Sequence, residues 1–165
     1  MRPVILPFPE NAETAAALAK RLDAEVGAVT WRRFPDGETY VRIDAPVTGR
    51  ATILVCTLSR PDEKMLPLLL TAATAKDLGA SRVGLVAPYL AYMRQDARFQ
   101  PGEGVTSTYV ARLLSQAVDW LVTVDPHLHR HKSLPEQSGQ SPGKQQTTWR
   151  GQCSPPSSLL LRPLS

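Results

Sequence analysis

Cysteine is scarce in this 165-residue chain, which contains only Cys56, in an apolar run, and Cys153, near the end. The two do not have the spacing of a metal-binding motif, and so few cysteines are typical of a protein kept in a reducing compartment. The sequence also lacks an apolar run long enough to span a membrane. Met1–Phe8 is too short for a signal peptide, and Glu10 and Glu13 follow it closely. We therefore expect a soluble, cytoplasmic protein.

Charge of one sign is not concentrated anywhere. Residues 1–134 carry 16 Lys and Arg against 14 Asp and Glu, the last 31 residues carry 3 against 1, and the net charge is +4. Nucleic-acid-binding domains usually gather basic residues in a patch or stripe, so this balance argues against a nucleic-acid partner. The glycine motifs G-x-x-x-x-G-K and G-x-G-x-x-G, which cradle nucleotide phosphates, are also absent from the sequence.

Apolar runs and helical patterns alternate along the first 124 residues. The runs that predict strands are 4–6, 52–58, 82–87 and 120–124, and the predicted helices are 11–22, from 59 or 62 to 78, and 106–117. Residues 28–34 and 39–43 flank Pro35-Asp36-Gly37, which is typical of a hairpin turn. This order predicts an α/β fold, a three-layer sandwich with a mostly parallel sheet.

The helix ends and faces can be predicted as well. Asn11 is a candidate N-cap of the first helix, Ser59 or Asp62 caps the second, and Gly79 follows the second as a natural C-terminal residue. Apolar residues at helical spacing on the second helix are Met65, Leu66, Leu69, Leu70 and Ala73. Those predicted to face inward on the third are Tyr109, Val110, Leu113 and Leu114.

The composition changes abruptly after Leu134. Of the last 31 residues, 19 are Pro, Ser, Gln or Gly, and none is Ala, Val, Ile or Asp. Such a segment cannot bury enough apolar area to offset its ordering entropy, so we predict one domain over 1–133 and a disordered tail over 134–165. A frameshift or an aberrant gene model explains so sharp a break better than an evolved linker, and a genuine low-complexity tail is the alternative.

The loop that follows the strand at 82–87 is rich in polar and aromatic residues. Its sequence PYLAYMRQDARFQPGEG, residues 88–104, contains Arg94, Gln95, Asp96 and Arg98. Open α/β sheets place ligand sites at the carboxyl ends of their strands, and a guanidinium offers a fork of donors that matches phosphate. A solvated loop whose arginines pair with Asp96 and Glu103 explains this stretch equally well by itself.

Two further segments carry candidate binding residues. The turn Phe34-Pro35-Asp36-Gly37-Glu38 holds an aromatic ring and two carboxylates, although alone it is an ordinary hairpin tip. Asp125 and His127 follow the last strand, where they could hold a divalent cation or a water bound to one. An Asp and a His two residues apart are a weak metal signature, and a solvated basic loop is the alternative.

In this order and spacing, the three motifs resemble the amino-terminal half of the ribose-phosphate diphosphokinases, or phosphoribosyl diphosphate synthetases. The resemblance runs from about Val4 to Ser133. It implies a phosphoribosyltransferase-like amino-terminal domain that associates into homo-oligomers. It also implies a complete enzyme that uses Mg²⁺ to transfer the diphosphoryl group of ATP to ribose 5-phosphate. The products are phosphoribosyl diphosphate, needed for nucleotide biosynthesis, and AMP.

The resemblance also implies roles for individual residues. Phe34, Asp36 and Glu38 would reach across a subunit contact to the adenine and ribose of ATP. The residues expected to contact ATP and its phosphates from the loop are Arg94, Gln95, Asp96 and Arg98. The pair expected at the magnesium–ATP site is Asp125 and His127.

Departures from the family pattern limit what this chain can do alone. Pro126 and His129 differ from the usual signature around Asp125, and the 165 residues contain neither the Thr-Gly-Thr loop for ribose 5-phosphate nor the catalytic Lys and Arg of the flexible loop. We therefore expect a fragment that is inactive alone. The alternative is a non-catalytic nucleotide-binding or regulatory homologue that associates with a full-length partner. A salvage phosphoribosyltransferase is disfavoured because it too would carry the Thr-Gly-Thr loop.

Overall fold

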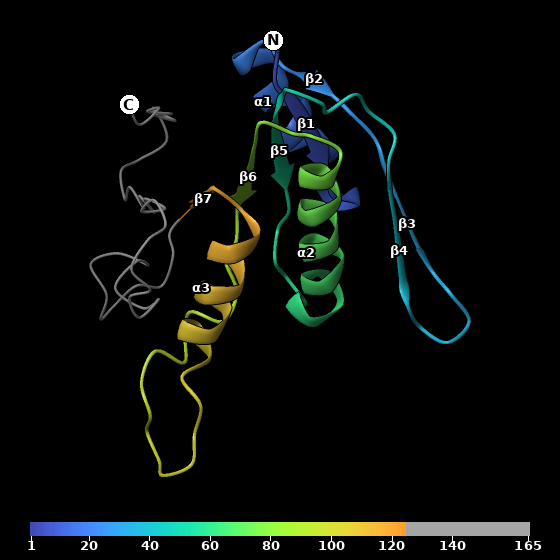
Figure 1. The fold of residues 1–165 in the computed structure, drawn as a ribbon. Helices are drawn as coiled ribbons and strands as arrows, with labels where there is room; N and C mark the ends of the chain where they lie inside the picture. Colours follow the sequence, from blue (N-terminus) through green and yellow to red (C-terminus); the bar gives the residue numbers. More distant parts are fainter. Residues whose placement is uncertain (125–165) are drawn as a thin grey trace.

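Five parallel strands form the central sheet in the computed structural model, which describes residues 1–124 (Figure 1). Their order across the sheet is β2-β1-β5-β6-β7, and every neighbouring pair is parallel. The strands are β1 (Val4–Pro7), β2 (Glu25–Val26), β5 (Ala51–Val55), β6 (Arg82–Ala87) and β7 (Trp120–Thr123). The connecting helices are α1 (Ala12–Leu22), α2 (Pro61–Asp77) and α3 (Thr106–Ala117), with a short 3-10 turn η1 (Pro9–Asn11) before α1.

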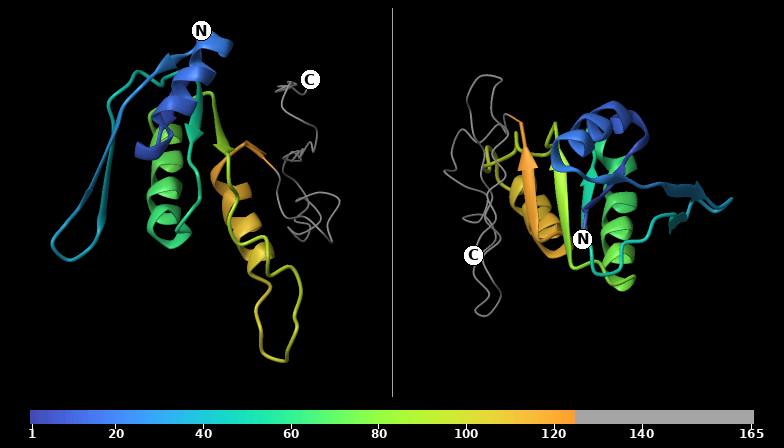
Figure 2. Two further views of the ribbon diagram at one scale, coloured as in Figure 1. Left: turned by 180° about the vertical axis from the view of Figure 1, so that it is seen from behind. Right: turned by 90° about the horizontal axis from the view of Figure 1, so that it is seen from above.

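Helices cover the two faces of this sheet, as the predicted three-layer sandwich requires. Successive strand residues point to opposite faces, so Leu6 joins one core cluster while Ile5 joins the other. The larger cluster contains Leu68 of α2 and Leu114 of α3, and the smaller contains Leu18 of α1. Accordingly, α1 lies behind the sheet in Figure 1 and in front of it when the molecule is turned round in Figure 2. Because both faces are covered, the strands read as continuous apolar runs.

The predicted hairpin is also present, as an antiparallel pair outside the main sheet. Its strands are β3 (Val29–Arg33) and β4 (Thr39–Ile43), and Trp31 pairs with Val41. It lies alongside α2, where the Trp31 Nε1 donates a hydrogen bond of 3.0 Å to the Thr71 Oγ1. The Trp31 ring also packs on Phe8, with ring centroids 4.5 Å apart. The base of the hairpin is therefore fixed to the domain, while its tip projects beyond α2 (Figure 1).

The predicted helix caps are confirmed only in part. Asn11 is the N-cap of α1, as predicted, but its side chain makes no capping hydrogen bond. Its amide instead donates to Thr57 Oγ1 at 2.7 Å, and its Oδ1 accepts from Thr57 N at 2.8 Å. For α2 the N-cap is Arg60, in place of Ser59 or Asp62, because Pro61 has the fixed φ that suits a first helical residue. Gly79 follows α2 with a φ of 85°, as expected for a helix end.

The predicted helix faces need correction as well. None of the five apolar residues predicted from spacing on α2 is fully buried; the buried ones are Leu68, Thr71, Ala72 and Ala75. On α3, Val110 and Leu114 are buried as predicted, but Tyr109 and Leu113 are exposed. Ser107 and Ala111 take the inward positions instead, because small side chains allow α3 to lie close to the sheet. No helix within residues 1–124 is long and apolar enough to cross a membrane.

Candidate functional site

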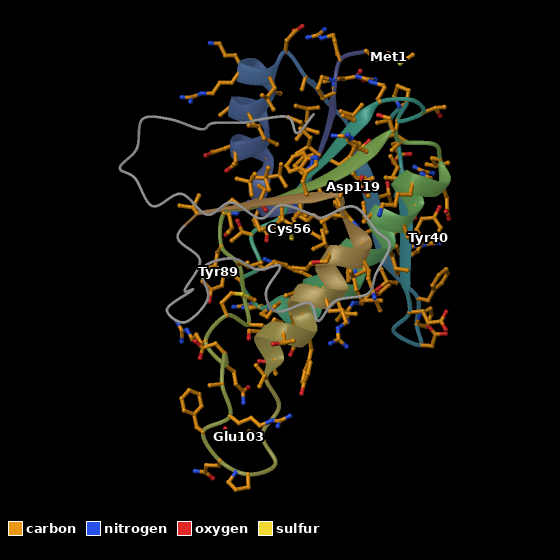
Figure 3. The ribbon with its side chains drawn as sticks, turned by 60° about the vertical axis from the view of Figure 1, so that its left-hand side comes forward. Met1, Tyr40, Cys56, Tyr89, Glu103 and Asp119 are labelled. Atoms are coloured by element: carbon orange, nitrogen blue, oxygen red, sulfur yellow. The ribbon has the colours of Figure 1, made fainter. Side chains whose placement is uncertain are left out.

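The loop from residue 88 to 105 leaves the carboxyl end of β6, between β5 and β7. Leu90, Ala91 and Met93 are buried and fix the start of the loop to the core. The backbone adds to this, because Leu58 N donates to Tyr89 O at 3.0 Å. Figure 3 shows Tyr89 at this anchored end and Glu103 at the far end, which projects away from the sheet. The loop is therefore placed where open α/β sheets bind ligands.

Arg94 and Gln95 lie at the point where the loop leaves the core. Arg94 is exposed, and its guanidinium makes no hydrogen bond or ion pair with any residue from 1 to 124. Gln95 is half-buried and is held at the start of α3: its Oε1 accepts from Thr106 Oγ1 and its backbone O from Ser107 N, both at 3.3 Å. The Arg94 guanidinium is therefore available to a ligand, while the neighbouring Gln95 is held to the start of α3.

The far end of the loop is organised by Glu103. Its Oε2 accepts from Phe99 N at 2.8 Å and from Gln100 N at 3.1 Å, and its backbone O accepts from Arg98 Nε at 3.1 Å. Glu103 therefore binds the backbone amides of the loop and forms no ion pair with Arg98 or Arg94 in the described part of the chain. Arg98 is exposed and keeps the remaining guanidinium donors, and Asp96 is half-buried.

The hairpin tip is a separate, tightly folded unit. Asp36 Oδ1 accepts from Glu38 N at 3.1 Å, Phe34 N donates to Glu38 O at 2.9 Å, and Gly37 takes a φ of 92° that a residue with a side chain rarely adopts. The Arg32 guanidinium lies over the rings of Phe34 and Tyr40, 5.1 and 4.8 Å from their centroids. The Phe34 ring stays 40% exposed, and both carboxylates are exposed. Ring and carboxylates are thus presented outward together.

The structure does not bring these two groups of residues together in one chain. The hairpin tip and the loop project on different sides of α2 and α3 in both Figure 1 and the reverse view of Figure 2. Figure 3 likewise separates Tyr40 of the hairpin from Tyr89 and Glu103 of the loop. If Phe34, Asp36 and Glu38 serve the same ligand as Arg94, they must do so in a neighbouring chain.

The predicted metal ligands, Asp125 and His127, lie outside the described residues, two and four positions after the end of β7. Within residues 1–124 no three His, Cys, Asp or Glu side chains are grouped so that they could hold a metal ion. The predicted disordered tail also lies outside the described residues.

A pocket that sequence reasoning missed lies between η1, the hairpin and α2. Its volume is about 530 Å³. It is lined by Phe8, Pro9, Glu10, Trp31, Arg32, Arg33, Thr39, Glu63, Lys64 and Pro67, and so by no residue of the 88–105 loop. Its lysine is already satisfied, because Lys64 Nζ donates to Thr57 O, Ser59 Oγ and Glu10. Burial raises the pKa of Glu10, but the hydrogen bond and charge of Lys64 outweigh burial and leave that pKa lowered. No sequence motif joins these three segments.

Cys56 is not a catalytic nucleophile. It lies fully buried in the larger core cluster, and burial, followed by the nearby Glu10 carboxylate, raises the pKa of its thiol to about 12. A thiol with such a pKa stays protonated at neutral pH, and only the thiolate attacks.

A mostly parallel α/β domain with a polar loop at the carboxyl edge of its sheet belongs to the class of open α/β domains, which bind their ligands at that edge. Comparison with known proteins defines the family more closely. The family model for the N-terminal domain of ribose phosphate pyrophosphokinase, another name for ribose-phosphate diphosphokinase, matches residues 4–117. The chain therefore belongs to the ribose-phosphate pyrophosphokinase family.

Individual relatives agree with this assignment. The chain is 41% identical over 125 residues to the ribose-phosphate pyrophosphokinase of Methanopyrus kandleri, covering 75% of this chain and 43% of that protein. It is 42% identical over 114 residues to that of Methanothermobacter thermautotrophicus, covering 68% and 40%. The crystal structure of phosphoribosylpyrophosphate synthetase from Mycobacterium smegmatis matches with a TM-score of 0.73 and 28% identity, over 83% of this chain and 46% of that one. The chain thus spans less than half the length of the relatives it matches.

Proposed function

We propose that this chain supplies the ATP-binding half of a ribose-phosphate diphosphokinase. In the proposed reaction of the complete enzyme, the anomeric hydroxyl oxygen of ribose 5-phosphate attacks the β-phosphorus of ATP. The bond from that phosphorus to the oxygen of the α-phosphate breaks, AMP leaves, and the hydroxyl proton is lost. Phosphoribosyl diphosphate, a precursor for nucleotide biosynthesis, is the other product.

The observation that carries this proposal is the state of Arg94. It is exposed at the carboxyl edge of a parallel sheet and has no partner within residues 1–124, although two acidic residues, Asp96 and Glu103, share its loop. A guanidinium in this state can donate two parallel hydrogen bonds to a phosphate. Gln95, Asp96 and Arg98 lie close to it in the chain and complete the phosphate side of the proposed site.

The adenine and ribose side of the proposed site comes from a second copy of the chain. Phe34 offers an exposed ring for the base, and Asp36 and Glu38 offer carboxylate acceptors for the sugar hydroxyls and the amino group. Supporting this, the hairpin tip is held by its own hydrogen bond and cation–π contacts, is exposed, and is distant from the loop of its own chain. We propose Asp125 and His127 as ligands of the Mg²⁺ that accompanies ATP.

The 165-residue chain alone is proposed to bind nucleotide without making phosphoribosyl diphosphate. Ribose 5-phosphate binding and catalysis need a Thr-Gly-Thr loop and a catalytic Lys and Arg, which this sequence does not contain. The same nucleotide site would serve a non-catalytic homologue that associates with a full-length partner. Synthesis of phosphoribosyl diphosphate in the presence and absence of a full-length partner separates these two functions.

Calorimetry with Mg–ATP tests the proposed site. Replacing Arg94 and Gln95 together by Ala should weaken binding by about 1.5–3 kcal/mol, because a hydrogen bond to a charged group is lost. Arg82→Ala is the matched control, since Arg82 is an exposed arginine at the opposite end of β6, and it should leave binding unchanged. A double variant that binds Mg–ATP as tightly as the parent would show that this loop is not the nucleotide site.

A further inference from the structure

Two residues with rare backbone conformations lie where the 88–105 loop meets the start of α2. Three non-glycine residues among 1–124 have a positive φ: Asp23, Arg60 and Tyr92. Asp23 ends α1 as a left-handed C-cap, a conformation that Asp tolerates comparatively well. Arg60 and Tyr92, with φ of 51° and 66°, are bulky residues for which this conformation is unfavourable. Such residues persist only where their surroundings hold them, and they cluster at ligand sites.

A single side-chain contact joins the two positions. The Tyr92 hydroxyl donates a hydrogen bond to Asp62 Oδ1, and Asp62 lies in the first turn of α2, two residues after Arg60. The Tyr92 ring also packs against the larger core cluster, between the buried residues Ala91 and Met93. The unusual backbone of Tyr92 is therefore held by burial on either side and by a carboxylate at the end of its ring.

This contact lies immediately before the residues proposed to bind phosphate. Tyr92 is two positions before Arg94, and Gln95 is hydrogen-bonded to Thr106 and Ser107 at the start of α3. The short segment that carries Arg94 is thus tied to α2 on one side and to α3 on the other. With both ends fixed, the Arg94 backbone has little freedom even though its side chain is exposed.

We propose that Tyr92 and Asp62 are a positioning pair that holds the segment from Met93 to Gln95 in its nucleotide-binding conformation. The proposal rests on the proposed function, because it assumes that Arg94 and Gln95 bind nucleotide. The pair itself makes no direct contact with the ligand. A ligand that binds only one conformation loses apparent affinity in proportion to the population of that conformation. Loss of the hydroxyl–carboxylate bond should therefore weaken Mg–ATP binding although Arg94 and Gln95 are intact.

Calorimetry on the whole 165-residue chain measures this effect. Tyr92→Phe and Asp62→Ala should each raise the Kd for Mg–ATP about tenfold, as expected if the competent population falls to about a tenth. The double variant should be no weaker than either single one, because both remove the same bond. Asp62→Asn keeps an oxygen acceptor and should be milder than Asp62→Ala. The matched controls, Glu63→Ala in the same turn of α2 and Tyr109→Phe on α3, should change the Kd less than twofold.

Hydrogen exchange of the nucleotide-free chain provides a second readout. In Tyr92→Phe the amide of Ser107, which donates to Gln95 O, should exchange about tenfold faster, while those of β5 and β6 stay unchanged. If the parent binds Mg–ATP and Tyr92→Phe binds it equally well, the positioning pair is wrong and the proposed function stands. A lower melting temperature with an unchanged Kd would likewise overturn the positioning pair. If the parent does not bind Mg–ATP at all, the proposed function fails, and faster exchange would then mark a purely structural contact.

Discussion

Arg94 and Glu103 belong to the same loop but differ in how their charges are used. Glu103 accepts hydrogen bonds from two backbone amides and so shapes the far end of the loop. Arg94 is exposed and makes no hydrogen bond or ion pair with the rest of the described chain. The distinction could not be made from the sequence, in which pairing of the arginines with Asp96 and Glu103 was an equal alternative. Because the Glu103 carboxylate binds backbone amides, it does not pair with an arginine of residues 1–124, and only Asp96 is left for that alternative.

Gly84 offers a test of the packing that supports the loop. A Cβ at this position of β6 would lie 2.0 Å from Cε2 and Cζ2 of Trp120 on the neighbouring strand β7. We expect Gly84→Ala to lower the free energy of unfolding by about 1–3 kcal/mol, because the Trp120 ring, which packs against the smaller core cluster, has to move to relieve this overlap. Urea unfolding measures the loss. Gly102→Ala, where the φ is 88° and no atom lies within 4 Å, is the control and should cost only about 1 kcal/mol.

The buried thiol of Cys56 predicts a pH dependence of stability. Its pKa is raised from 9.0 to about 12 by burial. Between these two values the unfolded chain releases a proton that the native protein keeps, so the free energy of unfolding falls as the pH rises. Cys56→Ala removes the titrating group and should flatten the decline between about pH 9 and 11 relative to the parent. Parallel declines in urea unfolding of the two proteins would contradict a raised native pKa.

At the scale of elements, strands and hairpin were predictable and helix faces were not. A buried parallel strand is apolar on both faces, so its signal does not depend on choosing a face. The middle of α2 is apolar nearly all round, and several stripes fit the helical spacing equally well. Packing against the sheet selects Leu68, Ala72 and Ala75, and Trp31 of the hairpin contacts Thr71; neither partner is visible in the sequence of α2. β2 was missed because it is only two residues long.

Asn11 joins two elements that are distant in the sequence. Because its side chain exchanges two hydrogen bonds with Thr57 after β5, it ties η1 to the carboxyl edge of the sheet. We expect Asn11→Ala to lower the free energy of unfolding by about 1–2 kcal/mol, since the half-buried Thr57 amide loses its acceptor. Asn11→Ser separates this role from helix capping, because Ser is a good N-cap but is too short to make both bonds. Recovery of the parental stability in Asn11→Ser by thermal unfolding would show that Asn11 acts as a cap.

At the scale of the whole molecule, the described domain holds two halves of a proposed site that do not meet. The loop at β6 presents Arg94 on one side, and the hairpin presents Phe34 on another (Figure 1). The chain also spans less than half the length of its relatives. The order of the motifs in the sequence predicted the family, but their spacing could not show that the two halves point apart, because that depends on how the hairpin packs on α2.

Mixing two defective chains tests this arrangement. Phe34→Ala removes the ring of the hairpin, and Arg94→Ala removes the cation of the loop. In a symmetric dimer whose sites combine the loop of one chain with the hairpin of the other, each mixed dimer holds one site with both defects and one intact site. Chains damaged in the same loop, Arg94→Ala and Gln95→Ala, are the control, because no mixed dimer of these two contains an intact site.

The most direct measurement is the stoichiometry of Mg–ATP binding at parental affinity after the chains are mixed and re-equilibrated. Each variant alone should show no site of parental affinity. An equal mixture of Phe34→Ala and Arg94→Ala should restore that affinity in about one site in four, since half of the dimers are mixed and each has one intact site. The control mixture should restore none. If the first mixture binds only as the sum of its two defective components, a nucleotide site shared between the loop and a neighbouring hairpin is ruled out.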